Sequence, residues 1–105
     1  MIKQAKFNIG QIVDHNKFLY RGVIFGVDPI FSLSEQWYEQ VAKSRPPKDE
    51  PWYHVLVDNE GHSTYVAEKN LNQSHDHSEI KHPNLGQYFT AYKNGMYISL
   101  PVYKQ

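Results

Sequence analysis

The sequence contains no cysteine, and that absence removes three kinds of chemistry. Disulfide bonds, zinc sites built on thiolates and cysteine nucleophiles all require a cysteine sulfur atom. No apolar run approaches the roughly 20 residues that a membrane-spanning helix needs, and no basic and apolar leader opens the chain. We therefore expect a cytoplasmic protein that makes no membrane contact.

A net charge is also missing, because 11 Lys and Arg residues balance 11 Asp and Glu residues. Proteins that bind nucleic acid through its phosphates usually carry a clear positive excess. The charges are unevenly placed, since residues 1–21 hold four basic side chains against Asp14, whereas residues 22–60 hold three against seven acidic ones. The four basic residues are candidates for DNA contact, with a solvated strand edge as the alternative: Lys3, Lys6, Lys17 and Arg21.

What the chain does contain is enough apolar material for one small core. It has 105 residues, of which 40% are hydrophobic and 14% aromatic, and we expect a single domain over residues 1–105. Alternating apolar residues predict strands near 9–13 and 19–27. Gly22 and Gly26 interrupt the second strand and predict a bulge or a strong bend there.

The segment PWYHVLVD, residues 51–58, places Trp52, Tyr53 and His54 in a row before two valines. Its alternation, the turn at 59–61 and the returning pattern over 62–68 predict a β-hairpin. We therefore expect a core strand here, and not the wall of an active site.

The spacing of apolar residues changes from that of a strand to that of a helix after Asp28–Pro29, and residues 32–44 fit a helix. Ser32 and Glu35 match a capping box, while Glu39 and Lys43 form an i, i+4 pair on the exposed side. The connection over residues 44–51 is polar and rich in proline, which predicts an irregular, mobile loop.

Two structures remain open for the last part of the chain. The stripe of Leu85, Phe89 and Tyr92 predicts a helix over 83–93. Asn94–Gly95 either caps this helix or turns a second hairpin, and residues 96–103 read as a final edge strand.

The histidines are the only residues that could form a metal or acid–base set. His75-Asp76-His77 resembles a zinc ligand group, but it lacks the i, i+4 spacing that places two imidazoles on one helix face, so a solvated loop is expected. His54 is expected to be a partly buried strand residue with a satisfied hydrogen bond. Neither a nucleophile turn nor a phosphate-binding loop is present, so the sequence predicts no enzyme activity, no metal and no cofactor.

Aromatic residues and the proline-rich loop are the best candidates for contact with a partner. Loops on a rigid small scaffold often bind partners, and aromatic side chains are enriched at interfaces. The alternative is that the aromatic residues fill the core. The candidate partner surface comprises Trp37, Tyr38, Arg45, Pro46, Pro47, Tyr97 and Tyr103.

Taken together, these stretches resemble a known family. KFNIGQIVDH, YRGVIFGVDPIFSLSEQWY, PWYHVLVD and TYVAEKNL stand in the order and near spacing of the bacterial heat shock HspQ family, also called the YccV-like or hemimethylated DNA-binding domain. The likeness covers Lys6 to about Leu71, and IKHPNLGQYF extends it to Phe89. A related domain occurs fused to an F-box in some eukaryotic proteins. The sequence after Phe89 departs from the bacterial pattern.

The resemblance implies a mainly β fold: a small, strongly bent antiparallel SH3-like barrel with a helix inserted after the second strand. The apolar stripe over 83–93 adds the expectation of a short C-terminal helix. The resemblance also implies a non-enzymatic stress-response protein that promotes degradation of misfolded proteins as a partner of the Lon protease. The alternative that it implies is recognition of hemimethylated DNA, with an effect on expression of the replication initiator. It further implies self-association as trimers.

Overall fold

The computed structural model describes residues 4–101, and it is mainly β with antiparallel pairing throughout. The strands are β1 (Ile12–His15), β2 (Arg21–Asp28), β3 (Trp52–Val57), β4 (Ser63–Ala67), β5 (Leu71–Gln73), β6 (Phe89–Lys93) and β7 (Met96–Ser99). The helices are α1 (Glu35–Val41), the 3₁₀ turn η1 (Glu68–Asn70) and the single turn α2 (Leu85–Tyr88). No helix within residues 4–101 is long and apolar enough to cross a membrane.

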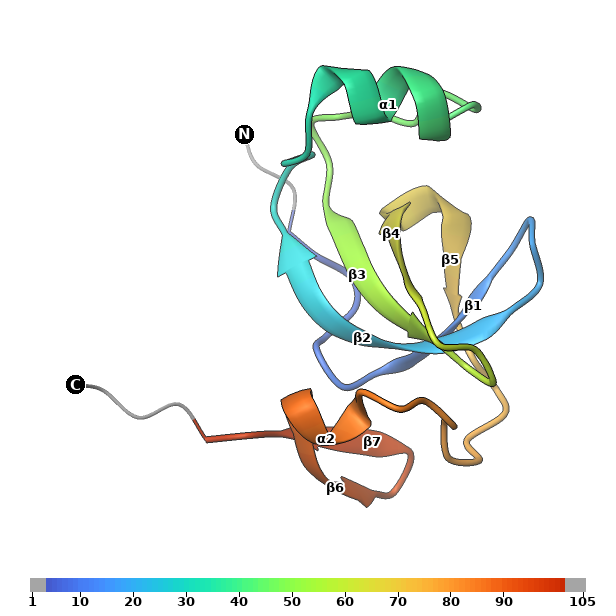
Figure 1. Cartoon of the computed structure of the whole chain (residues 1–105), viewed down its shortest axis with the longest axis vertical. Helices are drawn as coiled ribbons and strands as arrows, with labels where there is room; N and C mark the ends of the chain where they lie inside the picture. The colour runs from blue at the N-terminus through green and yellow to red at the C-terminus, as the bar shows by residue number, and fades with distance from the viewer. Residues whose placement is uncertain (1–3, 102–105) are drawn as a thin grey trace.

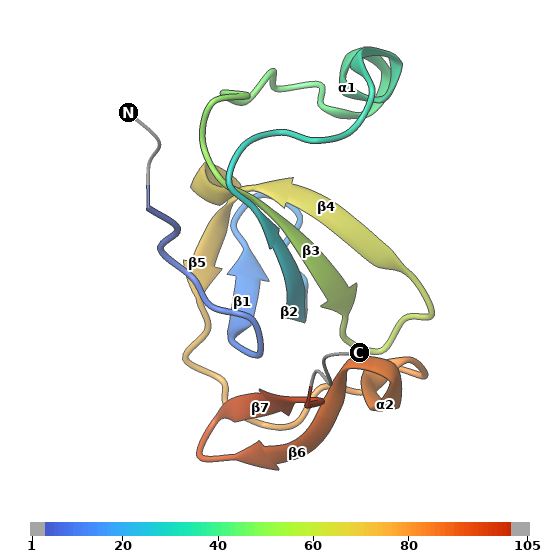
Figure 2. The ribbon, with the colours of Figure 1, turned by 90° about the vertical axis from the view of Figure 1, so that its left-hand side faces the viewer.

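Five strands form one sheet in the order β4-β3-β2-β1-β5, and β6 and β7 form a separate hairpin. The sheet is strongly bent, with α1 beyond one end and the β6–β7 hairpin beyond the other (Figures 1 and 2). The expected β class and the helix after the second strand are therefore confirmed. Within residues 4–101, β4 and β5 remain the two outer strands of the sheet, so closure into an SH3-like barrel stays a prediction.

The prediction that residues 51–58 form a core strand is confirmed. Trp52, Tyr53, Val55 and Leu56 in β3 are each no more than 1% exposed. Both faces of the strand are covered, because Leu56 packs in one apolar cluster while Tyr53 and Val55 pack in another.

The glycines of β2 permit the bend that the sequence predicts. The pairing of β2 with β3 shifts between Ile24 and Gly26, which is a bulge. A Cβ atom on Gly22 would lie 2.5 Å from a methyl carbon of Val55 and 2.6 Å from the carbonyl oxygen of Leu56. Any larger side chain at position 22 would therefore push β2 and β3 apart.

Helix α1 is shorter than expected, and its cap is different. Ser34, not Ser32, is the N-cap, and its hydroxyl oxygen accepts a hydrogen bond from the backbone N–H of Trp37 at 3.1 Å. The Ser32 hydroxyl instead donates to the carbonyl of Ile30. Because α1 ends at Val41, Lys43 lies outside the helix, and Glu39 pairs with Arg45 at 2.9 Å. The predicted pair of Glu39 and Lys43 is therefore wrong.

The predicted helix over 83–93 is also wrong beyond its first turn. Only Leu85–Tyr88 is helical, and the chain then turns back as the β6–β7 hairpin. Asn94 and Gly95 have φ values of 52° and 80°, the positive values that a tight two-residue hairpin turn requires. Phe89 and Tyr97 from this hairpin complete the apolar cluster around Ile12 and Leu56.

Candidate binding groove

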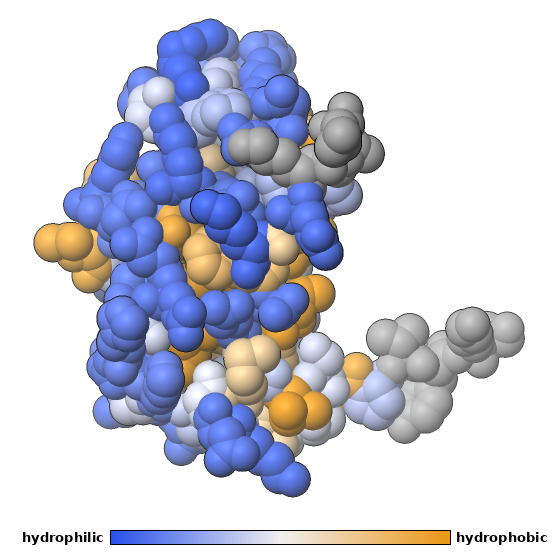
Figure 3. All heavy atoms as spheres, turned by 180° about the vertical axis from the view of Figure 1, so that it is seen from behind, coloured by the Kyte–Doolittle hydropathy of each residue, from blue (hydrophilic) through white to orange (hydrophobic). Residues whose placement is uncertain are grey.

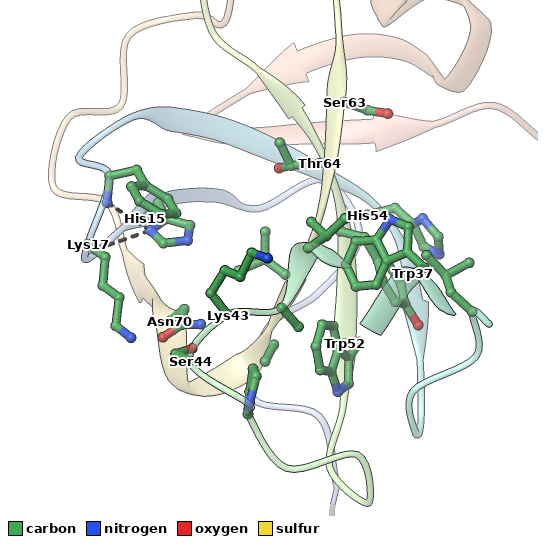
Figure 4. Close-up of a pocket in the computed structure, with 18 of the residues that line it drawn as sticks. His15, Lys17, Trp37, Lys43, Ser44, Trp52, His54, Ser63, Thr64 and Asn70 are labelled. Atoms are coloured by element: carbon green, nitrogen blue, oxygen red, sulfur yellow. Dashed lines mark hydrogen bonds between the residues drawn. The ribbon is translucent and has the colours of Figure 1, made fainter. Parts of the chain in front are cut away.

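An open groove of about 720 Å³ runs between α1, strand β4 and the β1–β2 hairpin (Figure 4). We call it the α1–β4 groove. Its lining residues come from four regions of the sequence: residues 15–20, 33–46, 52–54 and 63–70. The volume falls within the range of natural ligand pockets, so this groove is the candidate functional site.

Aromatic rings form one side of the groove. The rings of Trp52 and Tyr65 stack with their centroids 5.2 Å apart, and the ring of Trp37 meets Tyr65 edge-on at 5.6 Å. Trp52 is 1% exposed, whereas Trp37 and Tyr65 are half-buried and present part of their rings to the groove. Burial, followed by the hydrogen bond that the hydroxyl donates to Asp28, raises the pKa of Tyr65 to about 12.

The proline-rich loop is irregular, as expected, but it is held onto this aromatic cluster. The hydroxyl of Tyr38 donates to the carbonyl of Pro46 at 2.7 Å, and the indole N–H of Trp52 donates to the carbonyl of Pro47 at 3.0 Å. The backbone N–H of Phe31 bonds to the carbonyl of Lys48 at 2.9 Å. The wall formed by the loop is thus fixed before any ligand arrives, which lowers the entropic cost of binding.

The groove has positive charge at its sides and carries no carboxylate. Lys17 and Lys43 both line it, and no Asp or Glu is among its lining residues. Asn70 lies on the same side as Lys17 and faces the groove (Figure 4). An acidic or polar ligand segment would therefore be favoured over a basic one.

His15 is a buried polar residue that shapes the β1–β2 hairpin. It is 5% exposed, and its Nδ1 accepts hydrogen bonds from the backbone N–H groups of Lys17 and Phe18 at 3.1 and 3.0 Å. Burial lowers the pKa of His15 below its ordinary value, and the charge of Lys17 lowers it further. The ring therefore stays neutral near pH 7, which the acceptor role of Nδ1 requires.

The tip of the same hairpin exposes large apolar side chains. Phe18 is 75% and Leu19 83% exposed, and the tip forms an apolar protrusion on the surface (Figure 3). Phe18 lines the groove, as do Leu33 and Val41, which are 40% and 55% exposed. Exposed apolar residues gathered around one groove are typical of a binding surface.

The structure divides the predicted partner surface. Trp37 and Pro46 line the groove, and Arg45 and Pro47 are exposed near it. The exposure predicted for two tyrosines is wrong, because Tyr38 is 4% and Tyr97 6% exposed and each packs into an apolar cluster. Tyr97 in β7 also lies at the opposite end of the molecule from α1 (Figure 1). Tyr103 lies outside the described residues.

The four predicted DNA contacts do not form one patch in the described residues. Lys6 is exposed on the N-terminal segment, Lys17 lies beside the groove, and Lys3 is outside the described range. The side chain of Arg21 is only 13% exposed. It donates to the carbonyls of residues 76, 78 and 79 and pairs with Asp58 at 3.2 Å. Its guanidinium therefore fastens the 76–79 loop to the sheet, and it is not open to a phosphate.

Sequence reasoning missed the groove residues Tyr65, Lys43 and Asn70. One signal was available for Tyr65, because the hairpin turn at 59–61 sets it opposite His54 and on the face of Trp52. Lys43 was assigned to a helix that ends earlier, and nothing in the sequence brings Asn70 to the groove.

The histidines behave as ordinary structural residues. His54 is half-buried and its Nε2 lies 3.2 Å from a carboxylate oxygen of Asp28, which confirms the expected partly buried residue with a hydrogen bond. The loop containing His75 and His77 is exposed. Within residues 4–101, no three His, Asp or Glu side chains gather into a group that could hold a metal ion.

A bent β-sheet beside an open, largely apolar groove is typical of a binding domain. The comparisons agree with this class: a family model described as hemimethylated DNA-binding protein YccV-like matches residues 5–96. F-box only protein 21 from Homo sapiens is 33% identical over 94 residues, and the Mus musculus protein is 32% identical over the same length. Each match covers 88% of this chain but only 15% of the relative. The chain belongs to the YccV-like family, a family of binding domains.

Proposed function

We propose that this domain is a non-enzymatic protein-binding module of protein quality control. It binds apolar segments that misfolded proteins expose and promotes their degradation by an ATP-dependent protease such as Lon. We place this activity in the cytoplasm.

The observation that carries the proposal is the α1–β4 groove. A folded protein rarely leaves Phe18, Leu33 and Val41 exposed around one cavity unless another molecule covers them. Misfolded chains present the complementary surface, because their apolar side chains have left their own core. The fixed walls of the groove favour binding of such segments at a low ordering cost.

The test is reconstituted degradation of a heat-denatured client by purified Lon, with and without the domain. Wild-type domain is expected to accelerate degradation. Val41→Asp places a charge in the groove and should abolish the acceleration, whereas Ile98→Asp, at an apolar residue on β7 with 44% exposure, should retain it. The proposal fails if wild-type domain has no effect or if the two variants act alike.

Binding of hemimethylated DNA is the second candidate, and the description of the matching family favours it. The sequence carries no net charge, which limits the counterion release that drives binding to DNA phosphates. Because Arg21 is structural, three of the predicted basic residues remain; if they contact three phosphates, the logarithm of the binding constant should fall against the logarithm of salt concentration with a slope of roughly −2.7.

A hemimethylated duplex and its unmethylated control distinguish the two candidates. Binding that depends on methylation and persists at about 150 mM salt would favour DNA. Because Arg21 is structural and Lys17 lines the α1–β4 groove, Lys6→Ala is the better variant for this test. Capture of a protease from heat-stressed cells, unchanged by nuclease, would favour the quality-control role.

A further inference from the structure

Strand β4 leaves an unpaired backbone edge along the groove. Two hydrogen bonds at the ends of the β3–β4 pairing show which residue pairs are hydrogen-bonded. The N–H of Glu68 donates to the carbonyl of Pro51, and the N–H of Val57 donates to the carbonyl of His62. In an antiparallel pair, only alternate residues face the partner strand. Thr64 and Val66 therefore bond to β3, and the backbone groups of Ser63 and Tyr65 point away from it.

No hydrogen bond within residues 4–101 uses the backbone groups of Ser63 or Tyr65. Both residues line the α1–β4 groove. A free strand edge is a template for another extended chain. The groove thus offers two donors and two acceptors at the spacing of a β-strand.

The side-chain carboxamide of Asn70 is a second polar group at the groove that has no hydrogen-bond partner among the described residues. Asn70 is 9% exposed, and it faces the groove (Figure 4). No polar side-chain atom in the described residues is both buried and unpaired, so the polar atoms of this carboxamide are open to solvent. This carboxamide is therefore placed to bond a group that enters the groove.

We propose that the α1–β4 groove binds an extended peptide as an additional strand on β4, with an apolar residue flanked by acidic residues. This inference rests on the proposed function and specifies the segment that is recognised. The apolar residue lies opposite Tyr65, because paired residues share a face, and packs on Trp37. The acidic residues are selected by Lys17 and Lys43 in a groove that has no carboxylate lining it.

The test uses a short fluorescent peptide with a central phenylalanine between two glutamates. A second peptide replaces both glutamates with lysine, and a third carries N-methyl groups on the backbone nitrogens that would face Tyr65 and Ser63. Fluorescence anisotropy is expected to show binding of the first peptide. Loss of the two backbone donors should weaken binding about tenfold or more, and the lysine peptide should bind more weakly still.

Protein variants locate the site. Lys43→Glu should weaken binding of the glutamate peptide roughly fivefold, whereas Lys93→Glu, at an exposed lysine on β6, should not. Asn70→Leu should weaken binding without moving the bound peptide. In residue-resolved amide exchange, the peptide should slow exchange at Ser63 and Tyr65, while Thr64 and Val66 are already slow in the free domain.

The proposal is overturned if the peptide binds without slowing exchange at Ser63 and Tyr65, or if N-methylation has no effect. It is equally overturned if a single-stranded oligodeoxynucleotide, and not the peptide, protects these amides. If the peptide binds but the domain does not accelerate degradation, this inference is supported and the proposed function is contradicted. If the domain accelerates degradation and the Lys43→Glu and Asn70→Leu variants do so equally well, the proposed function stands and this inference is overturned.

Discussion

At the scale of single residues, buried polar side chains stabilise the fold through their hydrogen bonds. Arg21 and Glu68 tie together segments that are distant in the chain, whereas His15 bonds within its own hairpin. The carboxylate of Glu68, for instance, accepts from the Tyr53 hydroxyl at 2.5 Å and from the backbone N–H of Lys6 at 2.9 Å. Burial, and then this bond to Glu68, raises the pKa of Tyr53.

His15 should make stability depend on pH. Its pKa is lowered in the folded state, so the unfolded chain binds the proton more tightly. The contribution is complete above the unfolded pKa of about 6.5 and is lost as pH falls through the folded value. Urea unfolding at a series of pH values should show this loss. His15→Asn, which keeps an acceptor near Nδ1, should flatten the curve, and an unchanged curve would contradict the assignment.

Arg21 should matter for folding and not for DNA. Arg21→Ala removes the bonds to the 76–79 loop and leaves Asp58 without its partner. The free energy of unfolding should fall by about 3 kcal/mol. Lys81→Ala, at an exposed neighbour, serves as the control in the same denaturation series. A fully stable Arg21→Ala variant that had lost DNA affinity would restore the predicted phosphate contact.

At the scale of elements, α1 is a short helix whose start decides the position of Trp37. Ser34→Ala removes the cap and should cost about 1 kcal/mol. Ser32→Ala is the matched control, because this hydroxyl is outside the cap, and its effect should stay within about 0.5 kcal/mol. Thermal unfolding measures both, and equal effects would restore the capping box predicted at Ser32.

Strand β3 carries the core, so Trp52→Ala should unfold much of the domain. Truncating a buried tryptophan costs about 3–5 kcal/mol, a large share of a small domain's stability. Trp37→Ala should cost less, since Trp37 is half-buried. Chemical denaturation followed by circular dichroism compares the two. A well-folded Trp52→Ala domain that has lost its partner would instead place this residue on the functional surface.

The elements also show where sequence reasoning succeeds. The β3–β4 hairpin could be predicted because strict alternation surrounds a clear turn. The β6–β7 hairpin could not be chosen over a helix, because Leu85, Phe89 and Tyr92 match a helical stripe. Tertiary packing of Phe89 and Tyr97 against the sheet decides the outcome.

At the scale of the whole molecule, the candidate binding groove is assembled from segments that are far apart in the sequence. The β1–β2 hairpin, α1 with its loop, and β4 with η1 meet only because the sheet bends. The prediction that Trp37 and Pro46 belong to one surface rests on the type of the first and the loop of the second, and both do line the groove. The unpaired edge at Tyr65 and the inward-facing Asn70 depend on register and packing, which composition does not reveal.

The most direct test of the claim that the α1–β4 groove binds misfolded proteins is to map the surface that such a protein contacts. Isotope-labelled domain would be titrated with a heat-denatured protein, and amide chemical shifts would be followed residue by residue. We predict changes confined to the α1–β4 groove, at Phe18, Trp37, Lys43 and Ser63–Ala67, with the β6–β7 hairpin unaffected. Changes centred on the β6–β7 hairpin, or none at all, would contradict the claim that this groove is the binding site.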